Sequence, residues 1–405
     1  MSAPRVLAVS WEYPPVVQGG LARHVARLSS HLAAEGSEVR VLTRGGGRFA
    51  STREAPPGVV VDRVSMPDFP MHDLDGFLAW VDRLNDELWT AGAELDEVDV
   101  VHSHDWLVAE AASRLAAARG VPWVVTAHAT EHGRHQGRVG RHPQSRIHAA
   151  ERRMVRCADA VICCSDFMRR HLAGVFGLAA REIHVIPNGV DAAGPRPEDP
   201  GALRARFAEP GERLVLLAGR LVYEKGFHVA LDALARLRAG GMAVRYVLAG
   251  DGPARSELEA QARRLGLLEH GTFLGWADEE TVDGLYRVSD VCLVPSVYEP
   301  FGLVALEAMA AGCPVVVAAT GGLRELVPAG DAVGLRFRPQ DPRSLARAAE
   351  RVLEDDALRA RLTEAGRHHA AAYDWAEVAR QTAAVYAAAR RSAAAGARSR
   401  PVTAA

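Results

Sequence analysis

Short apolar runs alternate with helical segments along nearly the whole chain, and this order limits the fold more than any other feature. In the first half, the apolar runs have the length of buried strands and lie at residues 6–10, 39–43, 98–102, 123–127, 160–164 and 184–187. Apolar residues then recur at helical spacing over residues 21–35 and predict a helix there. Strands that alternate with helices predict a parallel sheet with right-handed crossovers.

A second region of the same kind follows a linker, which three prolines and three glycines mark within residues 188–201. Beyond it, strands are predicted at residues 214–218, 245–249, 271–274, 291–295 and 314–318, and helices at 228–237, 255–265, 279–289, 303–311 and 344–353. The sequence thus predicts an α/β protein of two doubly wound, Rossmann-like domains, at residues 1–190 and 200–374, whose strand ends face a central cleft. Residues 391–405 are expected to form a flexible tail.

Composition excludes several classes of protein. The chain has 405 residues and a net charge of −2, so no global field would attract nucleic acid or anionic lipid. It shows no signal-peptide pattern and no apolar run near the ~20 residues that span a bilayer, so we expect a cytoplasmic protein without a transmembrane segment. Peripheral membrane contact stays open. The five cysteines are expected to be buried thiols.

Lys225 is the only lysine among 48 Lys and Arg residues. It lies close after Arg220 in the segment Gly-Arg-Leu-Val-Tyr-Glu-Lys-Gly, which follows a predicted strand. Open α/β sheets bind ligands at the carboxyl ends of strands, and a compact ammonium fits a tight phosphate site differently from a guanidinium. We therefore interpret Arg220 and Lys225 as a pair of cations that holds a diphosphate. The alternative is an ordinary exposed loop lysine.

Two glycines open the first predicted helix, after the loop Trp-Glu-Tyr-Pro-Pro-Val-Val-Gln. Gly19 and Gly20 would let an anion approach the backbone N–H groups at the positive end of the helix. The segment lacks the lysine and Ser/Thr of a P-loop and is not a dinucleotide fingerprint. By itself it is equally consistent with a plain tight turn.

A similar arrangement recurs in the second half, where Gly302 and Leu303 open an apolar helix. Glu299 lies in the loop before this helix, and Glu307 lies one turn inside it. Carboxylates beside a phosphate site do not bind phosphate, but they suit the hydroxyl groups of a sugar or a ribose. For Glu307 the alternative is an exposed helix carboxylate, which its apolar neighbours disfavour.

His128 directly follows a predicted strand and is therefore expected at a ligand-binding edge. With His132 and His135 it has spacings of four and three, which would align three metal ligands on a helix. A glycine and the polarity of the segment disfavour a regular helix, so we expect no metal here. The acidic pair Asp73 and Asp75 lies at no strand end, and we interpret it as coincidental.

Glu299 and Glu307, with seven residues between them, match the E-x7-E signature of retaining glycosyltransferases. With the segment around Lys225 and the early Gly-Gly loop, the chain resembles the family 4 glycosyltransferases of GT-B fold from about residue 6 to 375. The segments His-Ser-His-Asp-Trp, Pro-Asn-Gly-Val-Asp and Trp-Glu-Tyr-Pro-Pro are similar to actinobacterial glycogen-synthase-like α-1,4-glucosyltransferases. The resemblance implies transfer of a hexosyl group, with glucose the favoured sugar, from UDP- or ADP-glucose to a glucan or another glycan or glycolipid. This transfer would need neither a metal nor a cofactor.

The resemblance also implies a role for each candidate residue. Arg220 and Lys225 would hold the donor diphosphate, and the backbone at Gly19-Gly20 and Gly302-Leu303 would complete its cradle. The remaining candidates would contact the rest of the donor: Glu299 the sugar hydroxyls, His128 the 6-hydroxyl, Glu307 the ribose, and Trp276 the base. A helix over residues 375–390 would cross back to the first domain.

Val17 departs from the family pattern, because glycogen synthases that use ADP-glucose carry a lysine at this place in Lys-x-Gly-Gly. The donor nucleotide and the acceptor therefore stay open. One alternative is transfer of another sugar, such as mannose, to a lipid-linked acceptor. Another is a non-catalytic sugar-nucleotide-binding protein, which would be expected to lose Glu299, His128 or Lys225. A phosphorylase of glycogen type would need a lysine for pyridoxal, and the single lysine is already assigned.

Overall fold

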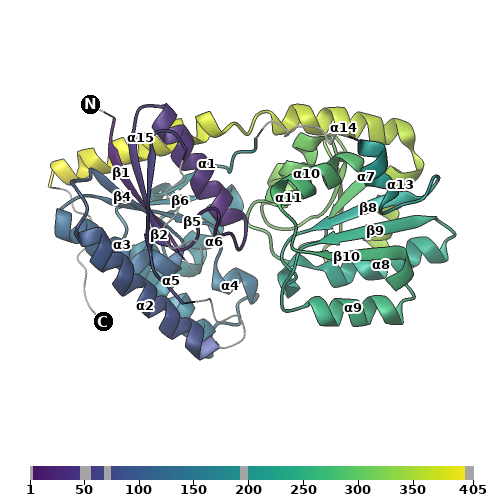
Figure 1. The fold of residues 1–405 in the computed structure, drawn as a ribbon, viewed down its shortest axis with the longest axis horizontal. Coiled ribbons are helices and arrows are strands. Elements are labelled where there is room, and N and C mark those ends of the chain that lie inside the picture. The colour runs from purple at the N-terminus through teal and green to yellow at the C-terminus, as the bar shows by residue number, and fades with distance from the viewer. Residues whose placement is uncertain (1–2, 46–55, 68–73, 192–198, 397–405) are drawn as a thin grey trace. The chain divides into compact units, whose positions relative to one another are not determined.

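The computed structural model describes residues 3–45, 56–67, 74–191 and 199–396, which form two compact units. Unit 1 comprises Met1–Gly189 and Trp375–Ala405, and unit 2 comprises Val190–Asp374. Each unit has a sheet of its own that is covered by helices (Figure 1). Within the described ranges, no helix combines the length and the apolar character needed to cross a membrane.

The sheet of unit 1 has seven parallel strands in the order β3-β2-β1-β4-β5-β6-β7. The strands are β1 (Arg5–Ser10), β2 (Glu38–Arg44), β3 (Val59–Val64), β4 (Val100–His104), β5 (Trp123–Ala127), β6 (Ala160–Cys163) and β7 (Ile183–Val185). The helices are α1 (Gly20–Ala34), α2 (Leu74–Ala93), α3 (Ala109–Arg119), α4 (Glu131–Arg134), α5 (Gln144–Cys157), α6 (Asp166–Phe176) and α15 (Trp375–Ala394), with 3-10 turns at Trp106–Val108 and Ala180–Glu182.

The C-terminal helix α15 belongs to the core of unit 1, although the chain leaves this unit between Gly189 and Trp375. Trp375 and Tyr386 are buried in the same cluster as α1 and β1, and Figure 1 shows α15 beside α1. The prediction that a flexible tail begins at residue 391 therefore places its start too early, because the helix continues to Ala394. Alanine and arginine are strong helix formers, and Ala389 near the end is still buried.

The sheet of unit 2 has six parallel strands in the order β10-β9-β8-β11-β12-β13. The strands are β8 (Arg213–Ala218), β9 (Val244–Ala249), β10 (Gly271–Gly275), β11 (Val291–Val294), β12 (Val315–Ala318) and β13 (Leu335–Phe337). The helices are α7 (Pro200–Ala205), α8 (Phe227–Ala239), α9 (Arg255–Arg264), α10 (Glu279–Val288), α11 (Leu303–Ala311), α12 (Leu323–Leu326), α13 (Pro342–Glu354) and α14 (Asp356–Ala370), with 3-10 turns at Tyr223–Lys225 and Leu268–His270.

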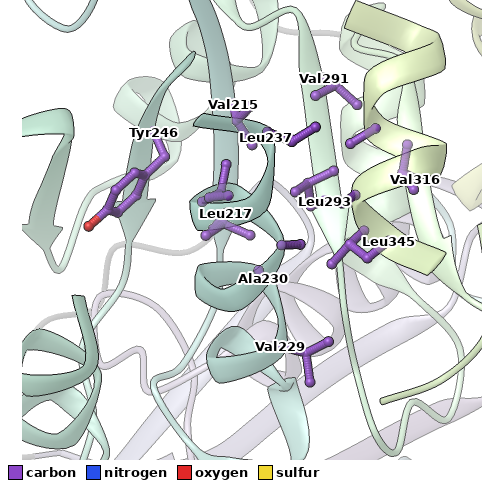
Figure 2. Close-up of a cluster of buried hydrophobic side chains, with 14 of the residues drawn as sticks. Val215, Leu217, Val229, Ala230, Leu237, Tyr246, Val291, Leu293, Val316 and Leu345 are labelled. Carbon is purple, nitrogen blue, oxygen red and sulfur yellow. The ribbon is translucent and has the colours of Figure 1, made fainter. Parts of the chain in front are cut away.

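The core of unit 2 fills the space between the sheet and the helices α8 and α13. Figure 2 shows side chains of β8, β11 and β12 directed toward Ala230 of α8 and Leu345 of α13. The central strands are buried on both faces, which explains why they consist of continuous apolar runs rather than alternating ones.

In both sheets the strand order reverses beside the first strand, between β1 and β4 in unit 1 and between β8 and β11 in unit 2. Ligands of doubly wound sheets bind outside the carboxyl ends of the strands at such a reversal. The fold class predicted from the sequence, two Rossmann-like parallel-sheet domains, is confirmed. The candidate residues can therefore be followed from the strand ends of each unit.

Candidate active site

Lys225 and Glu299 meet at the strand-order reversal of unit 2. The Lys225 ammonium donates a hydrogen bond of 2.7 Å to Glu299 Oε2, and the Ser296 hydroxyl donates to the same oxygen over 3.1 Å. Glu299 is buried, whereas the Lys225 side chain keeps 23% of its surface exposed. An ammonium has three N–H donors. The hydrogen bond to Glu299 fixes the direction of Nζ and leaves the other donors for an anion.

The loops after β8 and β11 hold this pair by direct backbone contact. Val297 N–H donates to the Glu224 carbonyl over 2.8 Å, and Gly226 adopts a left-handed φ of 68° against Pro295. A Cβ at Gly226 would lie 2.0 Å from the Pro295 carbonyl oxygen, so only glycine allows the two loops to approach this closely. From the other side, Gly322 N–H donates a hydrogen bond of 2.9 Å to the backbone carbonyl of Glu299. The geometry of the Lys225–Glu299 pair is therefore set by three loops.

The helix α11 begins directly beside Glu299. Gly302 precedes it with a φ of 116°, and no side chain caps its first turn. Glu307 is half-buried one turn inside the helix, where its Oε2 accepts a hydrogen bond of 3.1 Å from the Tyr286 hydroxyl of α10. Leu303 is the first helical residue. This helix start supplies the positive end of a dipole to whatever lies in front of it.

The remaining unit 2 candidates lie on loops at the same edge of the sheet. Arg220 is exposed and follows Gly219 at the end of β8. Trp276 directly follows β10 and keeps 67% of its surface exposed. An exposed indole next to a strand end offers a flat apolar face to a ring such as a nucleobase.

In unit 1, Gly19 and Gly20 lie where the sequence places them, at the start of α1. Gly19 has extended backbone and no side chain caps the helix. The preceding loop is folded around Glu12, which is buried and accepts a hydrogen bond from Gln18 N–H. Val17 is half-buried in this loop.

His128 follows β5 and is held from two sides. Its backbone N–H donates a hydrogen bond of 2.8 Å to Asp105 Oδ1. Its Nε2 lies 3.1 Å from Nδ1 of His104, the last residue of β4. Desolvation and, to a smaller extent, the charge of Arg134 lower the pKa of His128 to about 4. His128 is therefore neutral near pH 7 and can exchange hydrogen bonds with a hydroxyl group.

His132 and His135 contact groups other than His128. The helix α4 is only one turn long, and the His135 ring pairs with Glu131 at 3.0 Å. The His132 ring instead lies 5.4 Å from the ring of His171. Asp73 lies outside the described residues, and for Asp75 only its backbone, in α2, is described.

Sequence reasoning missed four residues that contact the candidates. His104 and His24 lie against His128, Ser296 bonds Glu299, and Tyr286 bonds Glu307. Three of them come from elements distant in the sequence, so no local pattern indicates them. The strand β4 ends two residues later than the range 98–102 predicts, and this shift places His104 at the strand end.

Two family models together match most of the chain. "Glycosyltransferase Family 4" matches residues 18–193, and "Glycosyl transferases group 1" matches residues 202–369. The chain is 42% identical to the "Glycogen synthase" of Mycobacterium tuberculosis, over 96% of this chain and 95% of that protein. It is also 33% identical to the "D-inositol 3-phosphate glycosyltransferase 1" of Catenulispora acidiphila, over 99% of both chains. The chain belongs to the family 4 glycosyltransferases.

Solved structures agree with this family. Sucrose-phosphate synthase from Thermosynechococcus elongatus is 25% identical, with a TM-score of 0.81 over 95% of this chain and 98% of that one. The catalytic domain of starch synthase IV from Arabidopsis thaliana, bound to ADP and acarbose, shares the fold at 20% identity, with a TM-score of 0.75 over 96% and 100% of the two chains. This family 4 glycosyltransferase is therefore an enzyme of GT-B fold, and its likeness to glycogen synthase, expected from the sequence, is confirmed.

Proposed function

We propose that this glycosyltransferase moves a glucosyl group from UDP- or ADP-glucose to a glucan, with retention of the anomeric configuration and without a metal. The observation that carries the proposal is the Lys225–Glu299–Ser296 arrangement beside the start of α11. It combines a directed cation, a helix dipole and a carboxylate in one place. The 42% identity to a glycogen synthase supports glucose and a glucan as the first substrates to test.

In this mechanism the chain stabilises charge that develops during transfer. The bond between the sugar C1 and the diphosphate oxygen breaks, which leaves a cation-like sugar and an anionic nucleoside diphosphate. Arg220, Lys225 and the first N–H groups of α11 would stabilise that anion, and preorganised donors of this kind supply much of the rate enhancement in many enzymes. The backbone of Gly19 and Gly20 would add to these donors.

Retention follows if the acceptor attacks C1 on the face that the diphosphate leaves. A new bond then forms between C1 and the acceptor oxygen, and the acceptor proton passes to the departing phosphate oxygen. The proposal needs no enzyme nucleophile and no cofactor. Glu299 would accept hydrogen bonds from sugar hydroxyls, and neutral His128 would contact the 6-hydroxyl. Glu307 would hold the ribose, and Trp276 would stack on the base.

Incubation of the purified chain with radiolabelled UDP-, ADP- and GDP-glucose, each with maltooligosaccharides, tests the proposal. We expect labelled, elongated oligosaccharide that an α-1,4-specific glucanase degrades, from UDP- or ADP-glucose. The similarity to inositol 3-phosphate glycosyltransferases makes D-inositol 3-phosphate the second acceptor to include. Label on inositol phosphate alone would overturn the glucan acceptor. A β-linked product would overturn retention.

A further inference from the structure

Three histidines of unit 1 converge on one point that the proposed transfer does not explain. One ring nitrogen from each of His24, His104 and His128 lies within 4.8 Å of the others. The ring centroid of His24 lies 5.4 Å from that of His104 and 4.6 Å from that of His128. They come from α1, from the end of β4 and from the residue after β5, so the fold of a single unit assembles them.

His24 is the least satisfied member of this cluster. Its side chain is buried at 6% exposure, and neither ring nitrogen makes a hydrogen bond of good geometry among the described residues, although the Asn188 side chain interacts with the ring. A buried polar group without a partner costs free energy and calls for an explanation. The Trp375 ring packs against the His24 ring at a steep angle, with the ring centroids 5.3 Å apart.

The neighbouring His102 is not a fourth member, because both of its nitrogens are engaged. Nδ1 lies 2.6 Å from the Tyr386 hydroxyl and Nε2 lies 2.8 Å from the Thr126 hydroxyl. His104 and His128, by contrast, face each other through Nδ1 and Nε2 at 3.1 Å. Two nitrogens that share a tetrahedral zinc ion at ~2.0–2.1 Å lie roughly 3.3 Å apart, so this pair already has nearly the required spacing.

The chemistry of the three rings suits a transition metal rather than a hard cation. Burial lowers the pKa of all three histidines, so each ring is neutral near pH 7 and offers a lone pair. Neutral imidazoles are preferred ligands of Zn²⁺ and similar ions, whereas Mg²⁺ and Ca²⁺ prefer oxygen. The Asp105 carboxylate, which accepts from His128 N–H, adds negative charge behind the site.

We propose that His24, His104 and His128 bind a zinc-like transition-metal ion, and that the bound ion inhibits the enzyme. Three protein ligands leave a fourth position for water. The ion would be coordinated by the nitrogen of His128 that faces His104. The proton now shared between these two rings would move to another ring nitrogen. The inhibitory part rests on the proposed contact between His128 and the donor sugar. The binding part does not.

The test is metal binding by the full-length enzyme after treatment with a chelator and its removal. Zn²⁺ is titrated in competition with a chromophoric chelator, and Co²⁺ is followed by its visible absorption. We expect one tight ion per chain, with a tetrahedral Co²⁺ spectrum that lacks a thiolate band. His24→Gln should weaken Zn²⁺ binding about tenfold or more, and His368→Gln, at an exposed site of α14, should leave it unchanged.

Thermal unfolding of each variant shows whether it is folded, and His104→Gln serves as a second ligand variant. Equal Zn²⁺ affinity of the wild type and both folded ligand variants would overturn the site, as would a thiolate band, which would assign the ion to cysteine. Wild-type turnover at saturating Zn²⁺, with the ion bound, would overturn inhibition alone. Because binding is measured without a substrate, failure of the glucosyl-transfer proposal gives a different result.

Discussion

At the scale of single residues, the Lys225–Glu299 pair is better suited to direct an ammonium than to stabilise the fold. A partly buried ion pair gains Coulomb energy but loses hydration, so its net contribution to folding is small. Glu299 is held in place by Ser296 and by the backbone of Gly322, whatever its charge partner. The pair therefore makes predictions that separate catalysis from stability.

Lys225→Arg should lower kcat about tenfold or more and change the melting temperature little. The guanidinium keeps the charge, but its planar fork cannot occupy the place of a compact ammonium 2.7 Å from Glu299. Arg347→Lys exchanges the same two residue types on the exposed side of α13 and should leave turnover unchanged. Wild-type kcat for Lys225→Arg at matched thermal stability would contradict the phosphate role.

Tyr286→Phe should raise KM for the nucleotide sugar about three- to tenfold and leave kcat nearly unchanged. The exchange removes the hydrogen bond that orients Glu307, which is worth about 1 kcal/mol. Tyr246→Phe is the matched control, because the buried Tyr246 hydroxyl has no partner among the described residues. A Tyr286→Phe variant that loses kcat at constant KM would argue against a ribose role for Glu307.

The site residues that sequence could indicate are those with a local signal. Lys225 stands out by its uniqueness, and Glu299 and Gly302 by their place between a strand and a helix. His24 has no such signal, and the segment His-Ser-His-Asp-Trp marks His104 without indicating its neighbours, because both become neighbours of His128 only when three separate elements pack together. Contacts between distant segments depend on packing, which no periodicity encodes.

At the scale of elements, the sequence predicts all the central strands but only two of the four edge strands, β7 and β10. Strands buried on both faces are short apolar runs, and β5 was located to the residue. The other two edge strands, β3 and β13, contain charged residues, which interrupt their apolar runs, and the sequence does not predict them. The helices α2 and α5 also escaped, since they fall between strands in segments of mixed polarity.

Gly226→Ala should destabilise unit 2 by at least about 2 kcal/mol more than Gly266→Ala. Both glycines have nearly the same left-handed φ, 68° and 66°, so the intrinsic cost of about 1–2 kcal/mol is shared. A Cβ at Gly226 would lie 2.0 Å from the Pro295 carbonyl oxygen, whereas one at Gly266 meets nothing within 4 Å. Chemical denaturation measures the difference, and equal losses would show that the two loops can separate without cost.

At the scale of the whole molecule, the expected absence of a metal requirement can be tested together with the histidine cluster. Activity should survive EDTA, because the proposed site stabilises the diphosphate with cations and helix ends. In a preparation that carries zinc, EDTA should raise activity. Loss of turnover in EDTA that Mg²⁺ or Mn²⁺ restores would reopen the role of Asp73 and Asp75.

The stability of unit 1 should depend on pH through groups that are buried in their neutral forms. Burial lowers the pKa of His102 to about 3 and of His128 to about 4, and it lowers the pKa of His24 and His104 in the same direction. As the pH falls below 6.5, the unfolded chain binds protons at these histidines and the folded chain does not. Stability is therefore present above 6.5 and is lost toward pH 4.

Glu151 acts in the opposite direction. Burial raises its pKa to about 8 from an ordinary 4.5, so the folded chain keeps a proton that the unfolded chain has lost, and stability falls as the pH rises from 4.5 to 8. Each titrating group changes the free energy of unfolding by up to about 1.4 kcal/mol per pH unit. Below pH 6.5 the four histidines together therefore outweigh the one carboxyl. Unit 1 should thus be most stable near pH 6.5–7.

Calorimetric melting of the full chain at pH 8, 7, 6 and 5 measures this dependence. The transition of unit 1 should shift to lower temperature by many degrees between pH 6.5 and 5, and by less between pH 7 and 8. Glu151→Gln keeps an oxygen that can accept from Glu131 N–H and removes the titrating group, so it should flatten the alkaline side and leave the acid side unchanged. A unit 1 transition that stays constant between pH 7 and 5 would show that these histidines are protonated in the folded chain, which contradicts their neutral role beside the donor sugar.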